Sequence, residues 1–163
     1  MTALPATTFP GVIPVLNPAN QQRVGEIPQY DSQAVSAAAD RARAAQLRWA
    51  ATPMAQRVRI LRDFRRILCE QKDEVADVIT REAGKPKSEA LATEVMVILD
   101  TVGFLVDYAP MFLQPEPVPH SNPIMKLKRG WLLRQPYGVI GIISPWNYPF
   151  SVPAVETLSA LKG

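Results

Sequence analysis

The feature that most constrains the fold is an apolar run near the end of the chain that leads into a loop and a helix. Gly138 to Ser144 reads GVIGIIS, and its β-branched residues predict a strand buried on both faces of a parallel sheet. Pro153, beyond the loop, predicts the first turn of a short helix. A parallel strand needs a second strand after the crossover helix, and the sequence supplies none. We therefore expect part of a larger α/β fold.

Composition excludes several classes of protein. The 163 residues carry a net charge of +3, with 47% hydrophobic and 20% charged residues, as in a globular protein with its own core. Lys and Arg alternate with Asp and Glu along the predicted helices, so we expect no nucleic-acid partner. No apolar run approaches the ~18 residues of a membrane span, and no secretory signal is visible at the start. With one cysteine, the chain fits a cytoplasmic location.

The first half of the chain reads as a hairpin followed by helices. Val12–Leu16 and Val24–Ile27 predict two strands joined by a turn at Asn17–Asn20. Asp31 or Ser32 is a good N-cap for a helix through about Ala50. Small apolar residues recur along it at helical spacing and predict a narrow, close-packing face; they are Val35, Ala38, Ala39, Ala42, Ala45 and Trp49.

Three further helices are predicted before the chain changes character. They cover about residues 55–71, a stretch ending at Gly84, and about residues 87–108. Gly84 is placed for a left-handed C-cap, with Pro86 preventing continuation. Five prolines between Ala109 and Pro123 predict an exposed connection. Met125–Pro136 then predicts a hairpin that turns at Arg129–Gly130.

The loop after the apolar run reads PWNYP and carries an uncharged amide, Asn147. Loops at the carboxyl ends of strands in α/β sheets line ligand crevices. An amide N–H at such a place can stabilise a developing oxyanion, typically by ~3 kcal/mol, and Pro145 and Pro149 would restrict the loop backbone. The alternative is that Asn147 caps a turn and that Trp146 is a core aromatic. The spacing of the residues alone favours this structural alternative over a catalytic loop.

Other reactive residues give weaker signals. Cys69 lies inside a helix, just off the apolar stripe and beside Glu70, and we expect a packing cysteine. His120 has no Cys, Asp or second His near it in sequence, so we expect no metal site and no catalytic triad. Charged residues around the helix end at Gly84 predict a solvated or ion-paired surface; they are Glu82, Lys85 and Glu89.

Several motifs together resemble one known family. GVIGIISPWNYPF resembles the signature at the entry to the cofactor domain of the aldehyde dehydrogenase superfamily. NPANQQRVGEIP is similar to the N-terminal hairpin of that family, EAGKP to its E-x-G-K-P helix terminus, and LLRQPYGV to the usual lead-in to the strand. The resemblance covers about residues 12–161 in the order of the family.

The resemblance implies an α/β fold, an incomplete Rossmann-like cofactor domain with an N-terminal hairpin, helices and an oligomerisation hairpin. The implied parts are the N-terminal hairpin and helical part (1–114), the linker with the oligomerisation hairpin around Met125–Arg134 (115–136), and the first strand–loop–helix of the cofactor-binding sheet (137–163). A homo-oligomer is implied for a complete enzyme.

The resemblance also implies residue roles. Asn147 would hold the carbonyl oxygen of an aldehyde and then the tetrahedral oxyanion. NAD or NADP would lie along Ser144, Pro145, Trp146 and Asn147. A substrate tunnel would be lined by Tyr148, Ser151 and Val155. NAD(P) binding depends on the resemblance alone, because the chain has no G-x-G-x-x-G phosphate loop.

The catalytic residues of the resembled reaction are incomplete in this chain. The nucleophilic cysteine, the glutamate base and the ribose-binding segment fall beyond residue 163 of the family pattern. We therefore expect the N-terminal, truncated part of an NAD(P)-dependent aldehyde dehydrogenase, inactive alone. The alternative is a non-catalytic interaction or regulatory fragment that joins full-length subunits through its basic hairpin and the edge of the predicted 138–144 strand.

Overall fold

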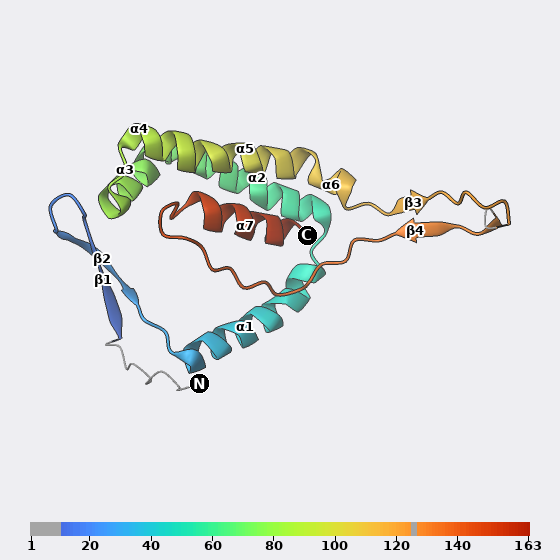
Figure 1. The fold of residues 1–163 in the computed structure, drawn as a ribbon, viewed down its shortest axis with the longest axis horizontal. Coiled ribbons are helices and arrows are strands. Elements are labelled where there is room, and N and C mark those ends of the chain that lie inside the picture. The colour runs from blue at the N-terminus through green and yellow to red at the C-terminus, as the bar shows by residue number, and fades with distance from the viewer. Residues whose placement is uncertain (1–10, 125–126) are drawn as a thin grey trace.

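The N-terminal hairpin forms as predicted. In the computed structural model, which describes residues 11–124 and 127–163, strand β1 (Val12–Leu16) pairs antiparallel with β2 (Arg23–Pro28) (Figure 1). Ile13 lies opposite Ile27. The side-chain oxygen of Asn17 accepts a 2.9 Å hydrogen bond from the backbone N–H of Ala19 and shapes the turn between the strands.

Helix α1 (Ser32–Ala50) begins where the sequence predicts, but its apolar face is not packed. Asp31 is the N-cap, and its carboxylate accepts a 2.7 Å hydrogen bond from the N–H of Ala34. None of its residues is buried, and Val35 is 59% exposed, so the predicted close-packing face is wrong. α1 instead runs at an angle away from the other helices (Figure 1), and Trp49 Nε1 near its end donates a 3.0 Å hydrogen bond to the carbonyl of Leu161.

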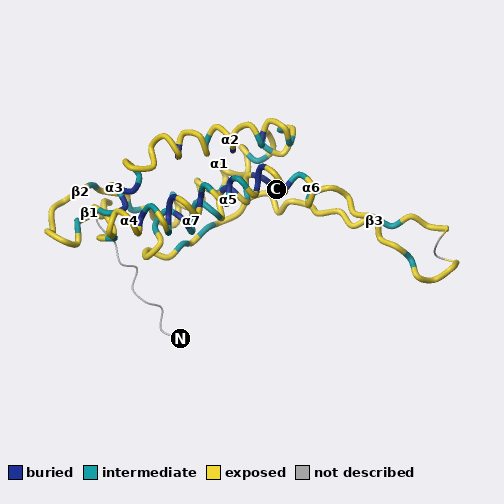
Figure 2. The backbone as a smooth tube through the Cα atoms, turned by 90° about the horizontal axis from the view of Figure 1, so that it is seen from above, coloured by how far each residue is buried: buried dark blue, intermediate teal, exposed yellow. Residues whose placement is uncertain are grey.

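The core lies between the remaining helices. These are α2 (Met54–Glu70), α3 (Lys72–Ala83), α4 (Lys87–Ala90), a π-helical turn η1 (Leu91–Val95), α5 (Met96–Asp107), α6 (Ala109–Phe112) and α7 (Ser151–Lys162). Leu61 of α2, Ile98 of α5 and Leu158 of α7 belong to one buried cluster. Figure 2 shows the buried segments gathered in this helical body. The three predicted helices are therefore confirmed, and the last is continuous from α4 through η1 to α5.

The corner between α3 and α4 follows the predicted punctuation. Gly84 has φ 74° and ends α3, so the left-handed C-cap is confirmed. A Cβ atom at Gly84 would lie 2.8 Å from Cγ of Pro18, in the hairpin turn. Glycine is therefore required here by backbone conformation and by the close approach of the hairpin.

Replacing Gly84 by alanine should destabilise the chain by about 2 kcal/mol, because the left-handed conformation is costly for a residue with a Cβ and the methyl group would collide with Pro18. Denaturant unfolding measures the loss. Gly25→Ala is the matched control, since a Cβ there would meet no atom of the described residues within 4 Å. Equal losses in the two variants would contradict this account of Gly84.

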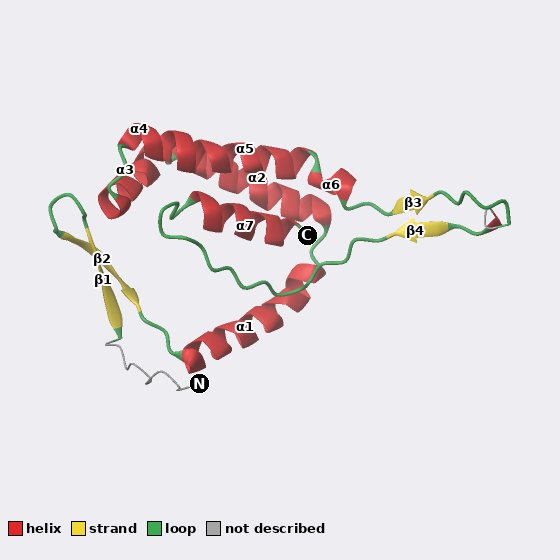
Figure 3. Cartoon of the chain, in the orientation of Figure 1, coloured by secondary structure: helices red, strands yellow, loops and turns green. Residues whose placement is uncertain are grey.

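The second hairpin lies earlier in the chain than predicted. β3 (Glu116–Val118) pairs antiparallel with β4 (Gly130–Leu132), placing Val118 opposite Gly130. Arg129–Gly130 is therefore not the turn, and part of the proline-rich connection is a strand. Pro117 is tolerated because an edge strand need not donate every N–H. Residues 125–126 of the predicted hairpin lie outside the described residues, and the hairpin projects from the helical body as an arm (Figure 3).

The predicted strand over Gly138–Ser144 is not formed. This segment has no regular structure, and the Ile143 side chain is fully exposed. The prediction is wrong here because a strand needs a neighbour for its backbone hydrogen bonds, and within residues 11–124 and 127–163 the strands pair only as β1 with β2 and β3 with β4. None of the helices in these ranges is long and apolar enough to cross a bilayer.

Candidate active-site loop

The candidate loop connects the 138–144 segment, most of which is exposed, to α7. Asn147 lies in a turn and is exposed. Among the described residues its side-chain amide makes no hydrogen bond, so both N–H groups are available to a ligand. The alternative in which Asn147 caps the turn through its side chain therefore has no contact to support it, and Trp146, 89% exposed, is not a core aromatic.

A buried carboxylate holds the end of this loop. Glu94, in η1, has no exposed surface, and its Oε2 accepts hydrogen bonds from the backbone N–H groups of Phe150 (3.0 Å) and Ser151 (2.7 Å). These are among the first N–H groups of α7, which have no partners inside the helix. Glu94 thus caps α7 from a different helix, and its negative charge suits the positive end of the helix dipole.

Lys85 pairs with the other oxygen of the same carboxylate. Its Nζ lies 2.6 Å from Glu94 Oε1, and the two side chains are 12% and 0% exposed. The same ammonium group lies 3.8 Å from the ring centroid of Tyr148, a cation–π contact. Lys85 is therefore ion-paired, as predicted for the charged residues at this helix end. The pair lies in the interior and not on the surface, because its partner Glu94 is buried.

The contacts of Glu94 keep it ionised. Burial by itself raises the pKa of this carboxyl, and the hydrogen bonds from Lys85, Ser151 and Phe150 oppose burial. The net effect holds the pKa of Glu94 below its ordinary value. The carboxylate therefore accepts the loop N–H groups throughout the neutral range.

Glu94 is the residue that sequence reasoning missed. It lies three residues after Leu91 and four before Ile98, on the apolar stripe of the predicted 87–108 helix. A charged residue on such a stripe is rarely buried without a partner. The position of Glu94 on the stripe is therefore the sequence signal that indicates a buried, paired carboxylate. Its partners come from sequence-distant segments, which spacing within one helix does not reveal.

The other predicted site residues divide between surface and core. Pro145 is exposed beside Trp146, whereas the Ser144 hydroxyl is buried and, among the described residues, lacks a hydrogen-bond partner. Ser151 is buried at the start of α7, and Val155, one turn later, packs against the core cluster. The structure thus brings Tyr148 and Ser151 together around Lys85 and Glu94.

Cys69 is exposed on α2, so its prediction as a packing cysteine is wrong. Its position just off the apolar stripe places it at an open pocket with Arg65, Arg66 and Leu99. His120 lies beside Gly130 in the arm, its Nε2 within 3.2 Å of where a Cβ would stand. Among the described residues no group of three His, Cys, Asp or Glu side chains could hold a metal ion.

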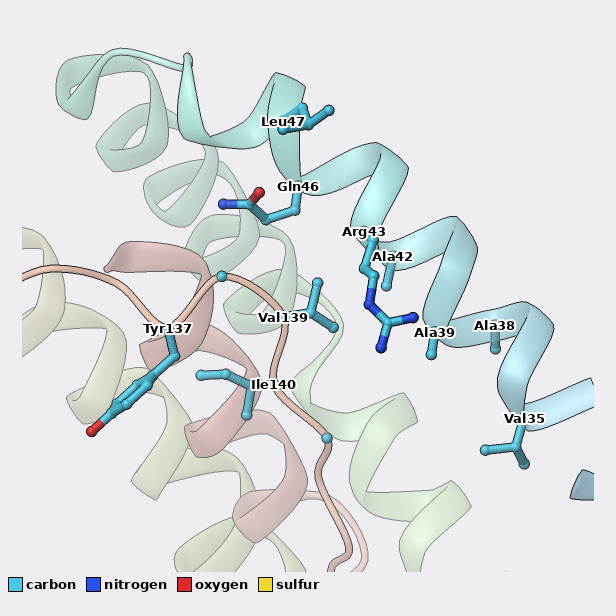
Figure 4. Close-up of a pocket in the computed structure, with 12 residues that line it drawn as sticks. Val35, Ala38, Ala39, Ala42, Arg43, Gln46, Leu47, Tyr137, Val139 and Ile140 are labelled. Atoms are coloured by element: carbon cyan, nitrogen blue, oxygen red, sulfur yellow. The ribbon is translucent and has the colours of Figure 1, made fainter.

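An open pocket separates α1 from the segment before the loop. Figure 4 shows side chains of α1, among them Arg43 and Gln46, facing Val139 and Ile140 across it. The small residues predicted to pack closely, including Ala38 and Ala42, line this space. The face of α1 on which these small residues recur therefore borders the pocket and does not pack against another described helix.

Comparison with known proteins identifies the family. The model of the aldehyde dehydrogenase family matches residues 6–162. Betaine aldehyde dehydrogenase of Beta vulgaris is 34% identical over 158 residues, covering 91% of this chain and 30% of the relative. Alpha-ketoglutarate semialdehyde dehydrogenase of Haloferax volcanii is 36% identical over 148 residues, covering 90% and 30%. The chain belongs to the aldehyde dehydrogenase family, and it spans about a third or less of the length of these relatives.

Solved structures agree. Aldehyde dehydrogenase 21 of Physcomitrella patens, solved with the reaction product succinate, superposes with a TM-score of 0.82 at 26% identity, covering 93% of this chain and 31% of that one. A putative methylmalonate-semialdehyde dehydrogenase of Sinorhizobium meliloti, solved with NAD, gives 0.74 at 29% identity, covering 88% and 28%. The predicted fold class, a partial α/β aldehyde dehydrogenase cofactor domain, is confirmed.

Proposed function

We propose that this chain is the N-terminal part of an NAD(P)-dependent enzyme that oxidises an aldehyde to a carboxylic acid. The observation that carries the proposal is the Asn147 amide, which is exposed and unpaired among the described residues, in a loop anchored to a buried carboxylate. A donor held in place before the reaction stabilises an oxyanion with little reorganisation.

In this proposal Asn147 binds the carbonyl oxygen of the aldehyde and donates to the same oxygen when it becomes an oxyanion. Tyr148, Ser151 and Val155 would line the approach of the substrate. Tyr148 is 37% exposed, which leaves part of the residue free for contact.

The cofactor would lie along Ser144, Pro145 and Trp146. The Ser144 hydroxyl, buried and without a hydrogen-bond partner in the described part of the chain, fits a polar group arriving beside it, and the exposed Trp146 offers an uncovered surface. A bound nicotinamide dinucleotide supplies the hydride acceptor. The residues of this chain would bind and orient it. The choice between NAD and NADP would belong to the ribose-binding segment, which falls beyond residue 163 in the family pattern.

The isolated chain should not catalyse the reaction. It spans 30% of the Beta vulgaris relative, and in the family pattern the nucleophilic cysteine and the glutamate base fall beyond residue 163. The exposed side chains of Val139, Ile140 and Ile143 fit a segment that another part of a complete protein covers. The same surface also fits the alternative, a fragment that associates with full-length subunits.

The test is an aldehyde-dependent assay of nicotinamide reduction, made with the chain alone and with the protein encoded by its extended reading frame. We expect reduction only with the extended protein. Activity of the chain alone would contradict the assignment of the nucleophile to a later segment. An extended protein that binds NAD(P) but oxidises no aldehyde would contradict the proposed reaction.

We also propose that the complete enzyme is a homo-oligomer formed through the β3–β4 arm, where Trp131 and Leu132 are exposed. Analytical ultracentrifugation of the extended protein with and without Trp131→Ser tests this role of the arm, because only an interface there predicts smaller assemblies in the variant.

The division of the chain into the parts 1–114, 115–136 and 137–163 stays a prediction, and so does a cytoplasmic location.

A further inference from the structure

We infer that the buried Lys85–Glu94 pair is a positioning device that fixes the Asn147 turn for catalysis. The inference rests on the proposed function, since it takes Asn147 as the oxyanion donor. Neither charged residue takes part in a chemical step; both act through the loop backbone and the Tyr148 ring.

Two contacts hold the part of the loop that follows Asn147 in the chain. Lys85 Nζ lies 3.8 Å from the ring centroid of Tyr148, the next residue. Glu94 Oε2 holds the N–H of Phe150, three residues after Asn147. Three residues of extended chain span at most ~10 Å, so Asn147 lies close to both points. Pro149, between them, further restricts the backbone.

One carboxylate joins these two points. Oε1 of Glu94 receives Lys85 at 2.6 Å, and Oε2 receives the two N–H groups at the start of α7. Phe150, the N-cap of α7, has an apolar side chain that cannot accept a capping hydrogen bond, so Glu94 of η1 supplies the cap. Moving or neutralising Glu94 would therefore release the ring contact and the helix start together.

A buried ion pair is a poor way to gain stability alone, because hydrophobic residues of similar volume often do as well. It is a good way to fix geometry, since each hydrogen bond has a defined direction. An oxyanion donor must be held within ~0.5 Å of its productive place. The charge pair therefore fits a role in placing the Asn147 turn.

The test is a double-mutant cycle in the extended enzyme, with kcat and KM for the aldehyde measured at each corner. Glu94→Gln keeps the size of the side chain but removes its charge. We expect kcat to fall about tenfold to 100-fold while KM changes less than about threefold, because misplacing a catalytic group by ~1 Å can cost that much. In an Asn147→Ala background the same change should lower kcat less than about twofold.

The matched control is Glu89→Gln, the same substitution at an exposed position five residues earlier, which should leave kcat unchanged. Lys85→Arg keeps a cation for Glu94 and Tyr148 and should retain more kcat than Lys85→Met. This second pair keeps the test decisive if Glu94→Gln fails to fold.

Hydrogen exchange gives a readout independent of catalysis. The N–H groups of Phe150 and Ser151 should exchange faster in Glu94→Gln than in the unchanged protein, while those of Ile98 and Val102 in α5 keep their protection. Unchanged exchange at the start of α7 would overturn the anchoring role.

The kinetic outcomes separate the two proposals. Equal losses from Glu94→Gln with and without Asn147 would overturn the positioning role alone, because the change would then not act through Asn147. An Asn147→Ala enzyme with full kcat would overturn the proposed function itself.

Discussion

Replacing Asn147 by alanine should lower kcat of the extended enzyme by about 10²- to 10³-fold, the typical cost of removing one oxyanion donor. The side-chain amide of Asn147 makes no hydrogen bond among the described residues, so its removal should leave the free energy of unfolding nearly unchanged. KM should change much less than kcat, because the interaction strengthens as the oxyanion forms. Steady-state kinetics and denaturant unfolding together make the measurement.

Asn20→Ala is a control for removing an exposed asparagine, since Asn20 lies in the β1–β2 turn, where its side-chain oxygen accepts a hydrogen bond from the N–H of Gln22. It should leave kcat unchanged. Full kcat in the Asn147→Ala enzyme, or a stability loss large enough to explain the fall, would contradict the oxyanion role.

Lys85→Met should have the largest effect on stability, roughly 3 kcal/mol at neutral pH. Removing one partner of a buried pair leaves the other charge uncompensated, which typically costs this much. Glu94 would keep its two backbone N–H groups, so the loss should fall at the lower end of the usual range. Lys87→Met is the control, because Lys87 pairs with Asp77 on the exposed surface, where pairs contribute ~1 kcal/mol or less.

The effect of Lys85→Met should depend on pH in a defined direction. The pKa of Glu94 is below its ordinary value in the folded chain, so its stabilisation is complete above the unfolded-state pKa of about 4.3 and is lost as pH falls through the folded-state pKa. A protonated Glu94 no longer needs Lys85. Urea unfolding at several pH values should therefore show the two proteins converging in acid, and a constant difference would contradict this account.

Local sequence signals predicted local structure well. Asp31 as N-cap, Gly84 as left-handed C-cap and the Asn17–Asn20 turn each satisfy nearby backbone groups, so a few neighbouring residues determine them. The family that the PWNYP loop and its flanking motifs resemble is confirmed. The roles of its individual residues remain predictions.

Features that depend on distant partners could not be predicted. Gly138–Ser144 has the composition of a buried strand, but the described residues offer it no neighbouring strand. β4 pairs with a proline-containing segment that composition assigned to a connection. Glu94 interrupts an apolar stripe, and only folding shows that it meets Lys85 and the start of α7.

The most direct test of the central claim is to read the coding sequence beyond the codon for Gly163 in all three frames. The account predicts a ribose-binding lysine segment, then a glutamate motif and a cysteine motif of the family, in the same or a shifted frame. Their absence from all three frames would contradict the claim that this chain is part of an aldehyde-oxidising enzyme, and it would favour the partner-binding alternative.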